Sequence, residues 1–184
     1  TGTASKNYDT TALFCEDYEI ISGALATDEF DNPIDAIEVI GNTSIIEAGV
    51  PIDNILYIRI YTIESGNELY RWDNNNHYSY NAYNVTFENG ELSIDKCPIT
   101  IRTTGTEKEY DGIGFKNVLY TVDGVGATIV NNYGFTIVVD DSDEENLFKT
   151  YKDVCDTYNT VVVNIVDSSD KDVTNNFDIN YEYG

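Results

Sequence analysis

Basic residues are scarce in this chain of 184 residues, and methionine and glutamine are absent. Its 10 Lys and Arg stand against 33 Asp and Glu, a formal charge of −23 at pH 7. Because such a surface repels phosphate backbones and anionic lipid headgroups, we expect no nucleic-acid partner. No apolar run approaches the ~20 residues of a membrane-spanning helix, and the first residues lack a signal-peptide pattern, so we expect no membrane insertion in this fragment.

Histidine and cysteine are too rare to support most catalytic centres. The single histidine, His77, stands without any GxSxG, HExxH or paired CxxC motif, so nucleophilic and zinc chemistry lack their usual parts. Three cysteines, Cys15, Cys97 and Cys155, cannot all pair within one chain. A Cys97–Cys155 disulfide and three unpaired thiols both stay open as interpretations. We expect the protein not to be an enzyme.

Three blocks of the sequence recur in the same order, which indicates two tandem units. In the last two blocks, apolar and polar residues alternate in both copies, as in half-buried strands. The pairs are TGTASKNYD (1–9) with TGTEKEYD (104–111), where one residue is inserted; NILYIRI (54–60) with NTVVVNI (159–165); and AYNVTFENG (82–90) with NFDINYEYG (176–184).

Other short segments rich in β-branched residues are bounded by Gly, Asn and Asp, which is typical of strands in a sandwich. One helix of one or two turns is predicted within DEENLFKTYKDVCDTY (143–158), which has an acidic start and apolar residues at helical spacing. The strand candidates are YEIISG (18–23), AIEVIG (36–41), ELSIDKCPITIRT (91–103), VLYTVDG (118–124) and GFTIVVD (134–140).

The pattern predicts an all-β fold of two tandem immunoglobulin-like antiparallel β-sandwich domains, residues 1–95 and 96–184. Their junction runs through Lys96, Cys97 and Pro98 without a Gly/Ser linker, so we expect an end-to-end arrangement. Each unit lacks one strand that the other unit has, PITI in the first and ELSI in the second. We therefore expect a window from a longer array.

The order of these elements resembles the tandem immunoglobulin-like YDG/MBG-type repeats of Gram-positive bacterial cell-surface proteins. The second unit carries the resemblance best, through Tyr110-Asp111-Gly112, Asn159 and Asp172-Val173-Thr174, whereas Thr10 replaces the glycine in the first. A Gly after Asp suits a turn with positive φ, and Asp followed by Thr suits side-chain-to-backbone bonds. The resemblance implies a wall-attached or secreted protein built from β-sandwich repeats, and it implies no chemistry.

The first unit carries an aromatic-rich insertion at about 66–82, because its stretch from Asn54 to Tyr83 is eleven residues longer than the matching stretch from Asn159 to Phe177. Aromatic rings beside amides and carboxylates suit a sugar-binding surface. The alternative is a longer hairpin whose aromatic residues cover the edge of the sandwich. The candidate ligand-binding residues are Tyr70, Trp72, Asp73, Asn75, His77, Tyr78 and Tyr80.

Two other sites are weaker candidates. An acidic run offers alternate carboxylates at Asp141, Asp143 and Glu145, which could hold calcium, although the favoured interpretation is a solvated acidic turn. No other cofactor is expected. Lysines near the unit starts, Lys6, Lys96 and Lys108, could form isopeptide crosslinks to Asn or Asp only if they were buried, which is costly.

These observations lead to one expectation about function and one rival. We expect a non-enzymatic extracellular module of a bacterial surface protein, acting as a structural spacer or adhesion repeat, with neighbouring repeats of the same polypeptide as partners. The rival is recognition of host or bacterial glycans, such as mucin sugars, through the aromatic insertion. The expected location is the bacterial cell surface, either cell-wall attached or secreted.

Overall fold

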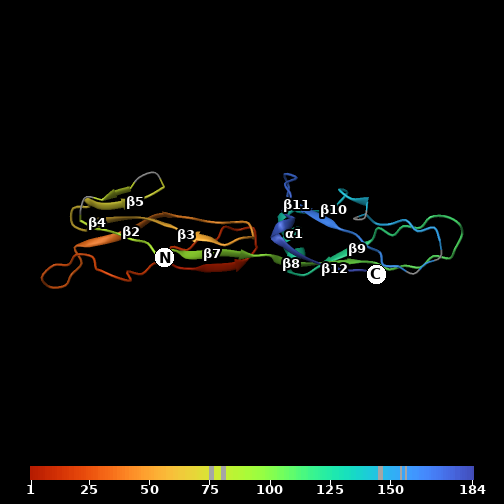
Figure 1. The fold of residues 1–184 in the computed structure, drawn as a ribbon, viewed down its shortest axis with the longest axis horizontal. Coiled ribbons are helices and arrows are strands. Elements are labelled where there is room, and N and C mark those ends of the chain that lie inside the picture. Colours follow the sequence, from red (N-terminus) through yellow and green to blue (C-terminus); the bar gives the residue numbers. More distant parts are fainter. Residues whose placement is uncertain (75–76, 80–81, 145–146, 154, 156) are drawn as a thin grey trace. The chain divides into compact units, whose positions relative to one another are not determined.

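The computed structural model describes residues 1–184 except 75–76, 80–81, 145–146, 154 and 156 (Figure 1). It is mostly β, with 38% strand and 8% helix, as the sequence predicts. The chain forms two compact units. The first contains Thr1–Lys6, Thr11–Ile46 and Val50–Ile94, and the second contains Asn7–Thr10, Glu47–Gly49 and Asp95–Gly184. In the described part of the chain, no helix is long and apolar enough to span a membrane.

The first unit contains two sheets. The larger is antiparallel with the order β2-β4-β5-β6, and β2, β4 and β5 lie side by side in Figure 1. The smaller sheet has the order β1-β7-β3. The strands are β1 (Ala4–Asn7), β2 (Asp35–Asn42), β3 (Ile52–Asn54), β4 (Leu56–Thr62), β5 (Glu68–Trp72), β6 (His77–Ser79) and β7 (Gly90–Asp95).

The core of the first unit forms on one face of β4, where the predicted alternation places Leu56, Ile58 and Ile60. Residues 82–88 cover this core through Tyr83 and other apolar side chains, yet they form no strand, contrary to the prediction. Residues 18–23 also lack the predicted strand. Both segments keep an apolar pattern, but no described strand pairs with either one to complete a ladder.

The second unit packs a three-stranded sheet, β12-β8-β9, against a two-stranded sheet, β10-β11. Apolar residues of both sheets share one core around Ile101 and Val163, as expected for a sandwich. One pairing differs from the expected antiparallel topology, because β12 runs parallel to β8. The strands are β8 (Cys97–Thr103), β9 (Tyr120–Asp123), β10 (Thr136–Val139), β11 (Val163–Val166) and β12 (Phe177–Glu182).

The α-helix of the second unit is α1 (Val125–Tyr133), which the sequence pattern did not predict. It ends at Gly134, whose φ of 68° provides a left-handed cap, and it packs closely on β8, because a Cβ built on Gly126 would lie 2.8 Å from Cβ of Ile99. The described residues of 143–158 contain no α-helix. Tyr151 is instead paired with Phe115 in an isolated β-bridge, which requires extended backbone. A 3₁₀ turn, η2 (Thr174–Asn176), precedes β12.

The two halves of the chain repeat the same turn and the same bridge. Thr10 and Gly112 both have positive φ, 72° and 76°, two residues after a Tyr. Leu13 then forms two backbone hydrogen bonds with Ile45, of 2.8 and 3.1 Å. Its counterpart Phe115 forms two with Tyr151, of 2.7 and 2.8 Å. The positive φ at Gly112 confirms the conformation predicted for the YDG turn.

A second set of equivalent contacts joins the start and the end of each half. The amide of Gly90 donates to Oγ1 of Thr1 at 2.8 Å, and the amide of Gly184 donates to Oγ1 of Thr103 at 3.1 Å. These contacts place Thr103, and not Thr104, opposite Thr1. Residues 1–13 therefore correspond to residues 103–115 position by position, without the inserted residue that the sequence alignment required.

An asparagine side chain completes the repeated arrangement. Nδ2 of Asn54 donates to the carbonyl of Gly2 at 2.9 Å, and Nδ2 of Asn159 donates to the carbonyl of Thr104 at 3.2 Å. Gly2 and Thr104 occupy the same position once Thr1 is matched with Thr103. The two halves thus share a backbone framework despite their different strand content.

Candidate functional site

The aromatic insertion forms strands β5 and β6, which pair antiparallel and extend the larger sheet of the first unit. The register places Tyr70 opposite Ser79 and Trp72 opposite His77. For His77 and Tyr78 the structure describes the strand backbone. Asn75 and Tyr80 lie outside the described residues.

Tyr70 does not belong to an exposed binding surface. Its side chain is 2% exposed and lies in the core beside Ile58 and Ile60. Burial raises the pKa of its hydroxyl. The expectation that this ring could stack on a sugar is wrong, because Tyr70 lies on the inward face of β5 and its ring is buried in the core.

Trp72 also packs inward, although less deeply. Its ring lies 5.9 Å from the ring of Phe87, measured between centroids, with an angle of 40° between the planes. Phe87 in turn belongs to the segment that covers the core of the first unit. This packing agrees with the hairpin interpretation, in which the aromatic residues of the insertion cover apolar surface.

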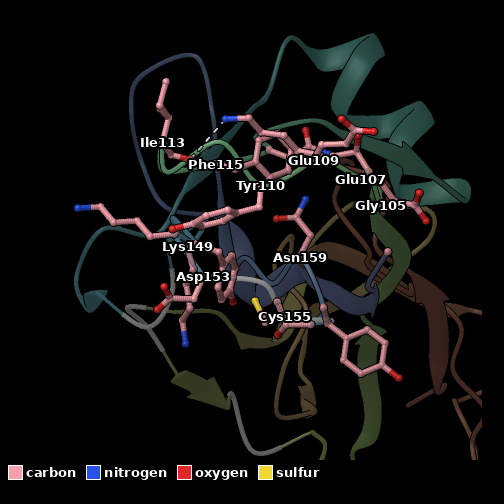
Figure 2. A pocket seen from close by; sticks show the side chains of 18 of the residues that line it. Gly105, Glu107, Glu109, Tyr110, Ile113, Phe115, Lys149, Asp153, Cys155 and Asn159 are labelled. Carbon is pink, nitrogen blue, oxygen red and sulfur yellow. Dashed lines mark hydrogen bonds between the residues drawn. The ribbon is translucent and has the colours of Figure 1, made fainter.

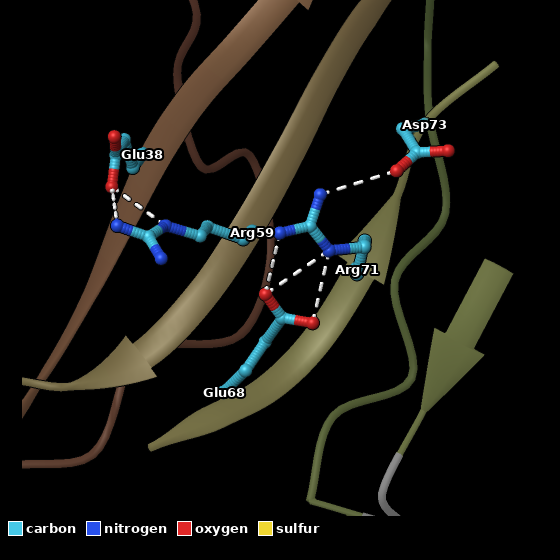
Figure 3. Close-up of polar contacts among 5 residues, drawn as sticks. All are labelled: Glu38, Arg59, Glu68, Arg71 and Asp73. Carbon is cyan, nitrogen blue, oxygen red and sulfur yellow. Dashed lines mark hydrogen bonds and ion pairs between the residues drawn. The ribbon is translucent and has the colours of Figure 1, made fainter. Parts of the chain in front are cut away.

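Charged groups on the outer face of β5 are paired with one another (Figure 3). Arg71 donates from Nη2 to Oε2 of Glu68 at 2.8 Å and from Nη1 to Oδ2 of Asp73 at 3.1 Å. These hydrogen bonds raise the pKa of Arg71, which remains a cation. On the neighbouring strands, Nε of Arg59 donates to Glu38 at 2.7 Å. The carboxylate of Asp73 is therefore engaged within the hairpin.

The acidic run of the second unit is a solvent-exposed turn at Asp141 and Asp143. The carboxylate of Asp140 accepts the amide of Ser142 at 3.0 Å, a local bond typical of such turns. Glu145 lies outside the described residues. Within the part of the chain that the structure covers, no three His, Cys, Asp or Glu side chains come together as a metal site would require.

The cysteines singled out in the sequence form no disulfide, and the lysines are not buried. All three cysteines are free, with Cys97 buried and Cys155 exposed, so the Cys97–Cys155 disulfide is not formed. Burial raises the pKa of the Cys97 thiol. The lysines Lys6, Lys96 and Lys108 are not buried, as an isopeptide bond would require.

In the described part of the chain, each unit contains a large cavity that the sequence analysis did not indicate. The cavity of the first unit, of about 670 Å³, lies between residues 18–25 and 82–90, over the apolar face of β4. The cavity of the second unit, of about 540 Å³, lies between residues 104–111 and 157–159 (Figure 2). No catalytic or metal-binding motif marks either site, although Tyr110, Asp111 and Asn159 of the repeat motif line the cavity of the second unit.

Comparisons with family models, with curated proteins and with solved structures give no match for this chain.

Proposed function

We propose that the chain is a non-enzymatic pair of β-sandwich repeats that serves as a spacer or adhesion module on a bacterial cell surface. The observation that carries the proposal is the repeated framework. The Thr1–Gly90 and Thr103–Gly184 contacts recur with the same partners in both halves, as expected for copies of one structural unit. A module of this kind acts through its length and its position in an array, and it needs no reactive centre.

The immunoglobulin-like character of each unit and their end-to-end arrangement are part of the same proposal. In the second unit, two packed sheets around Val163 support a sandwich. The strong negative charge favours solubility outside the cell. Small-angle X-ray scattering tests the arrangement: a pair distribution with a long tail is expected, and a profile of a compact sphere would overturn it.

Glycan recognition through the β5–β6 hairpin is less well supported. Tyr70 lies in the core, Trp72 packs on Phe87, and the carboxylate of Asp73 is held by Arg71. These contacts remove the stacking face of Tyr70 and occupy a polar group that a sugar would need.

A glycan array separates the two functions. The full chain, Trp72→Ala and the matched exposed-aromatic control Tyr158→Ala would be applied at equal concentration, after circular dichroism shows that each is folded. The spacer proposal predicts background signal for all three proteins. A signal from the wild type that Trp72→Ala abolishes and Tyr158→Ala preserves would contradict it and support glycan recognition.

A further inference from the structure

We propose that the two cavities are strand-accepting slots, each of which binds an extended segment with the sequence pattern of the junction Gly90–Thr103. This inference rests on the repeat architecture of the proposed function and not on its surface location. Its test is separate, because strand binding and glycan binding are measured on different variants.

The junction shows how one segment serves both units. Its first part is β7, the central strand of the smaller sheet of the first unit, where Leu92 is 0% and Ile94 is 3% exposed. Its second part is β8, the central strand of the larger sheet of the second unit, where Ile99 is 1% and Ile101 is 0% exposed. Each unit thus holds one half of this pattern as a buried central strand.

In the first unit the place of β7 is defined by its two neighbours. Strand β7 pairs antiparallel with β3, with Asn54 opposite Gly90 and Ile52 opposite Leu92. On its other side lies β1, and there the amide of Glu91 donates to Oγ1 of Thr3 at 3.1 Å.

In the second unit, the segments that correspond to β1 and β3 face a cavity. The counterpart of β1 is residues 106–109, and the counterpart of β3 is residues 157–159; neither forms a strand, and both line the 540 Å³ cavity. Figure 2 shows Glu107, Glu109 and Asn159 around it. Gly184 also lines the cavity, and its carbonyl accepts the amide of Asn159 at 2.8 Å. That bond joins the residues that correspond to Asn54 and Gly90, the first pair of the β3–β7 ladder.

Differences in exposure between the halves agree with an unfilled slot. Asn54 is 0% exposed, whereas its counterpart Asn159 is half-buried. Tyr110 and Ile113, which line the cavity of the second unit, are each 68% exposed. Large aromatic and aliphatic side chains that are exposed close to one another are typical of a surface that another segment covers.

The first unit has the complementary slot, at the place of β8. In the second unit β8 lies between β9 and β12. The counterparts of these two strands are residues 18–21 and 83–88, the irregular segments that line the 670 Å³ cavity. Ile20 and Ile21 there are 48% and 60% exposed. A strand with the pattern of β8 would give both segments a backbone partner.

The occupant is specified by the chemistry of the two slots. The cavity of the first unit has an apolar floor formed by β4, and the cavity of the second unit is lined by Tyr110, Ile113 and Phe115 among polar and charged side chains. We expect each to accept an extended chain with apolar side chains at alternate positions. Glu-Leu-Ser-Ile-Asp (91–95) fits the second unit, and Pro-Ile-Thr-Ile-Arg (98–102) fits the first. In the expected register, the first residue after Gly184 lies opposite Tyr158 and the next lies opposite Thr157.

Two extended chains test the inference. One carries Glu-Leu-Ser-Ile-Asp after Gly184, and its control carries Glu-Ser-Ser-Ser-Asp. The other carries Pro-Ile-Thr-Ile-Arg before Thr1, and its control carries Pro-Ser-Thr-Ser-Arg. Hydrogen exchange measured by mass spectrometry follows residues 106–109 and 157–159 for the first chain, and residues 18–21 and 83–88 for the second.

The apolar extensions are expected to slow exchange in their own slot by about tenfold or more, with little change in the other slot. The thermal midpoint of the extended unit should rise by about 5 °C. The serine controls should behave like the original chain. Unchanged exchange with the apolar extensions, or equal protection by the serine controls, would overturn the inference.

Discussion

Thr10 and Gly112 occupy the same left-handed turn, with φ of 72° and 76°, although only one of them is a glycine. The left-handed region is open to Gly, and it strains a β-branched side chain such as Thr. The turn is therefore imposed by the surrounding framework and not by the local residue, and it provides a direct test of the correspondence between the halves.

Substitutions at the two turn positions should change the free energy of unfolding in opposite directions. Gly112→Ala should lower the free energy of unfolding by about 1 kcal/mol, and Thr10→Gly should raise it by about 0.5 kcal/mol. A Cβ on Gly112 meets no atom within 4 Å, so the effect of alanine is conformational and not steric. Urea denaturation followed by circular dichroism measures both changes. A stabilising Gly112→Ala would show that the turn is not left-handed in solution.

Gly90→Ala should be much more destabilising than a glycine substitution at an open turn. A Cβ on Gly90 would lie 2.0 Å from the carbonyl oxygen of Gly2, so the start of β7 would have to move. We expect a loss of more than about 2 kcal/mol. Gly23→Ala is the control, because φ is +76° there but nothing lies within 4 Å, and its cost should be about 1 kcal/mol.

The fluorescence of Trp72 reports the unfolding of both glycine variants, because the one tryptophan of the chain lies in the first unit. Urea midpoints of Gly90→Ala and Gly23→Ala would be compared with the wild type. Equal midpoints for the two variants would contradict the close approach of Gly90 to Gly2.

Asp172 should contribute to acid sensitivity. Hydrogen bonds from the side chain and the backbone amide of Thr174 lower the pKa of Asp172, the latter at 2.8 Å. Because the folded pKa lies below the unfolded value of about 3.9, the stabilisation is present above that value and is lost as the pH falls through the folded pKa. Asp172→Asn should therefore lose less stability than the wild type between pH 5.5 and pH 3.

Asp178→Asn is the matched control, because it removes an exposed Asp carboxylate on β12 of the same unit. Urea midpoints at the two pH values give the comparison. If Asp178→Asn reduced the acid sensitivity as much as Asp172→Asn, general charge repulsion and not the Thr174 contact would be the cause.

The thiols should react in the order of their exposure. Cys155 is exposed and should react quickly with a disulfide reagent at pH 8, whereas Cys97 is 1% exposed and its raised pKa reduces the thiolate fraction. Mass spectrometry after timed labelling identifies the modified residue, and labelling in urea gives the full count of three. Rapid modification of Cys97 under native conditions would show that β8 is not buried.

The sequence predicted the strands that have their own alternation. Leu56, Ile58 and Ile60 lie in β4 as expected, and Val163 and Ile165 lie in β11. The side-chain-to-backbone bond expected after Asp172 is also confirmed by the contact with Thr174. These features depend on periodicity and on local hydrogen bonding, which a sequence displays directly.

Features that depend on distant contacts were not predictable. Helix α1 contains β-branched residues that favour strands locally, and it is held by Gly126 packing on Ile99 in β8. Residues 82–88 have strand periodicity but lack a paired neighbour. The hairpin at β5–β6 has an aromatic composition that suits sugar binding, and the burial of Tyr70 became visible only with the sheet in place.

The repeated framework is tested most directly by NMR on uniformly labelled protein. The structure predicts two matching sets of nuclear Overhauser effects: Gly90 to Gly2 and Leu13 to Ile45 in one half, and Gly184 to Thr104 and Phe115 to Tyr151 in the other. Observation of both sets would support one architecture repeated along the chain. One set without the other would contradict the account.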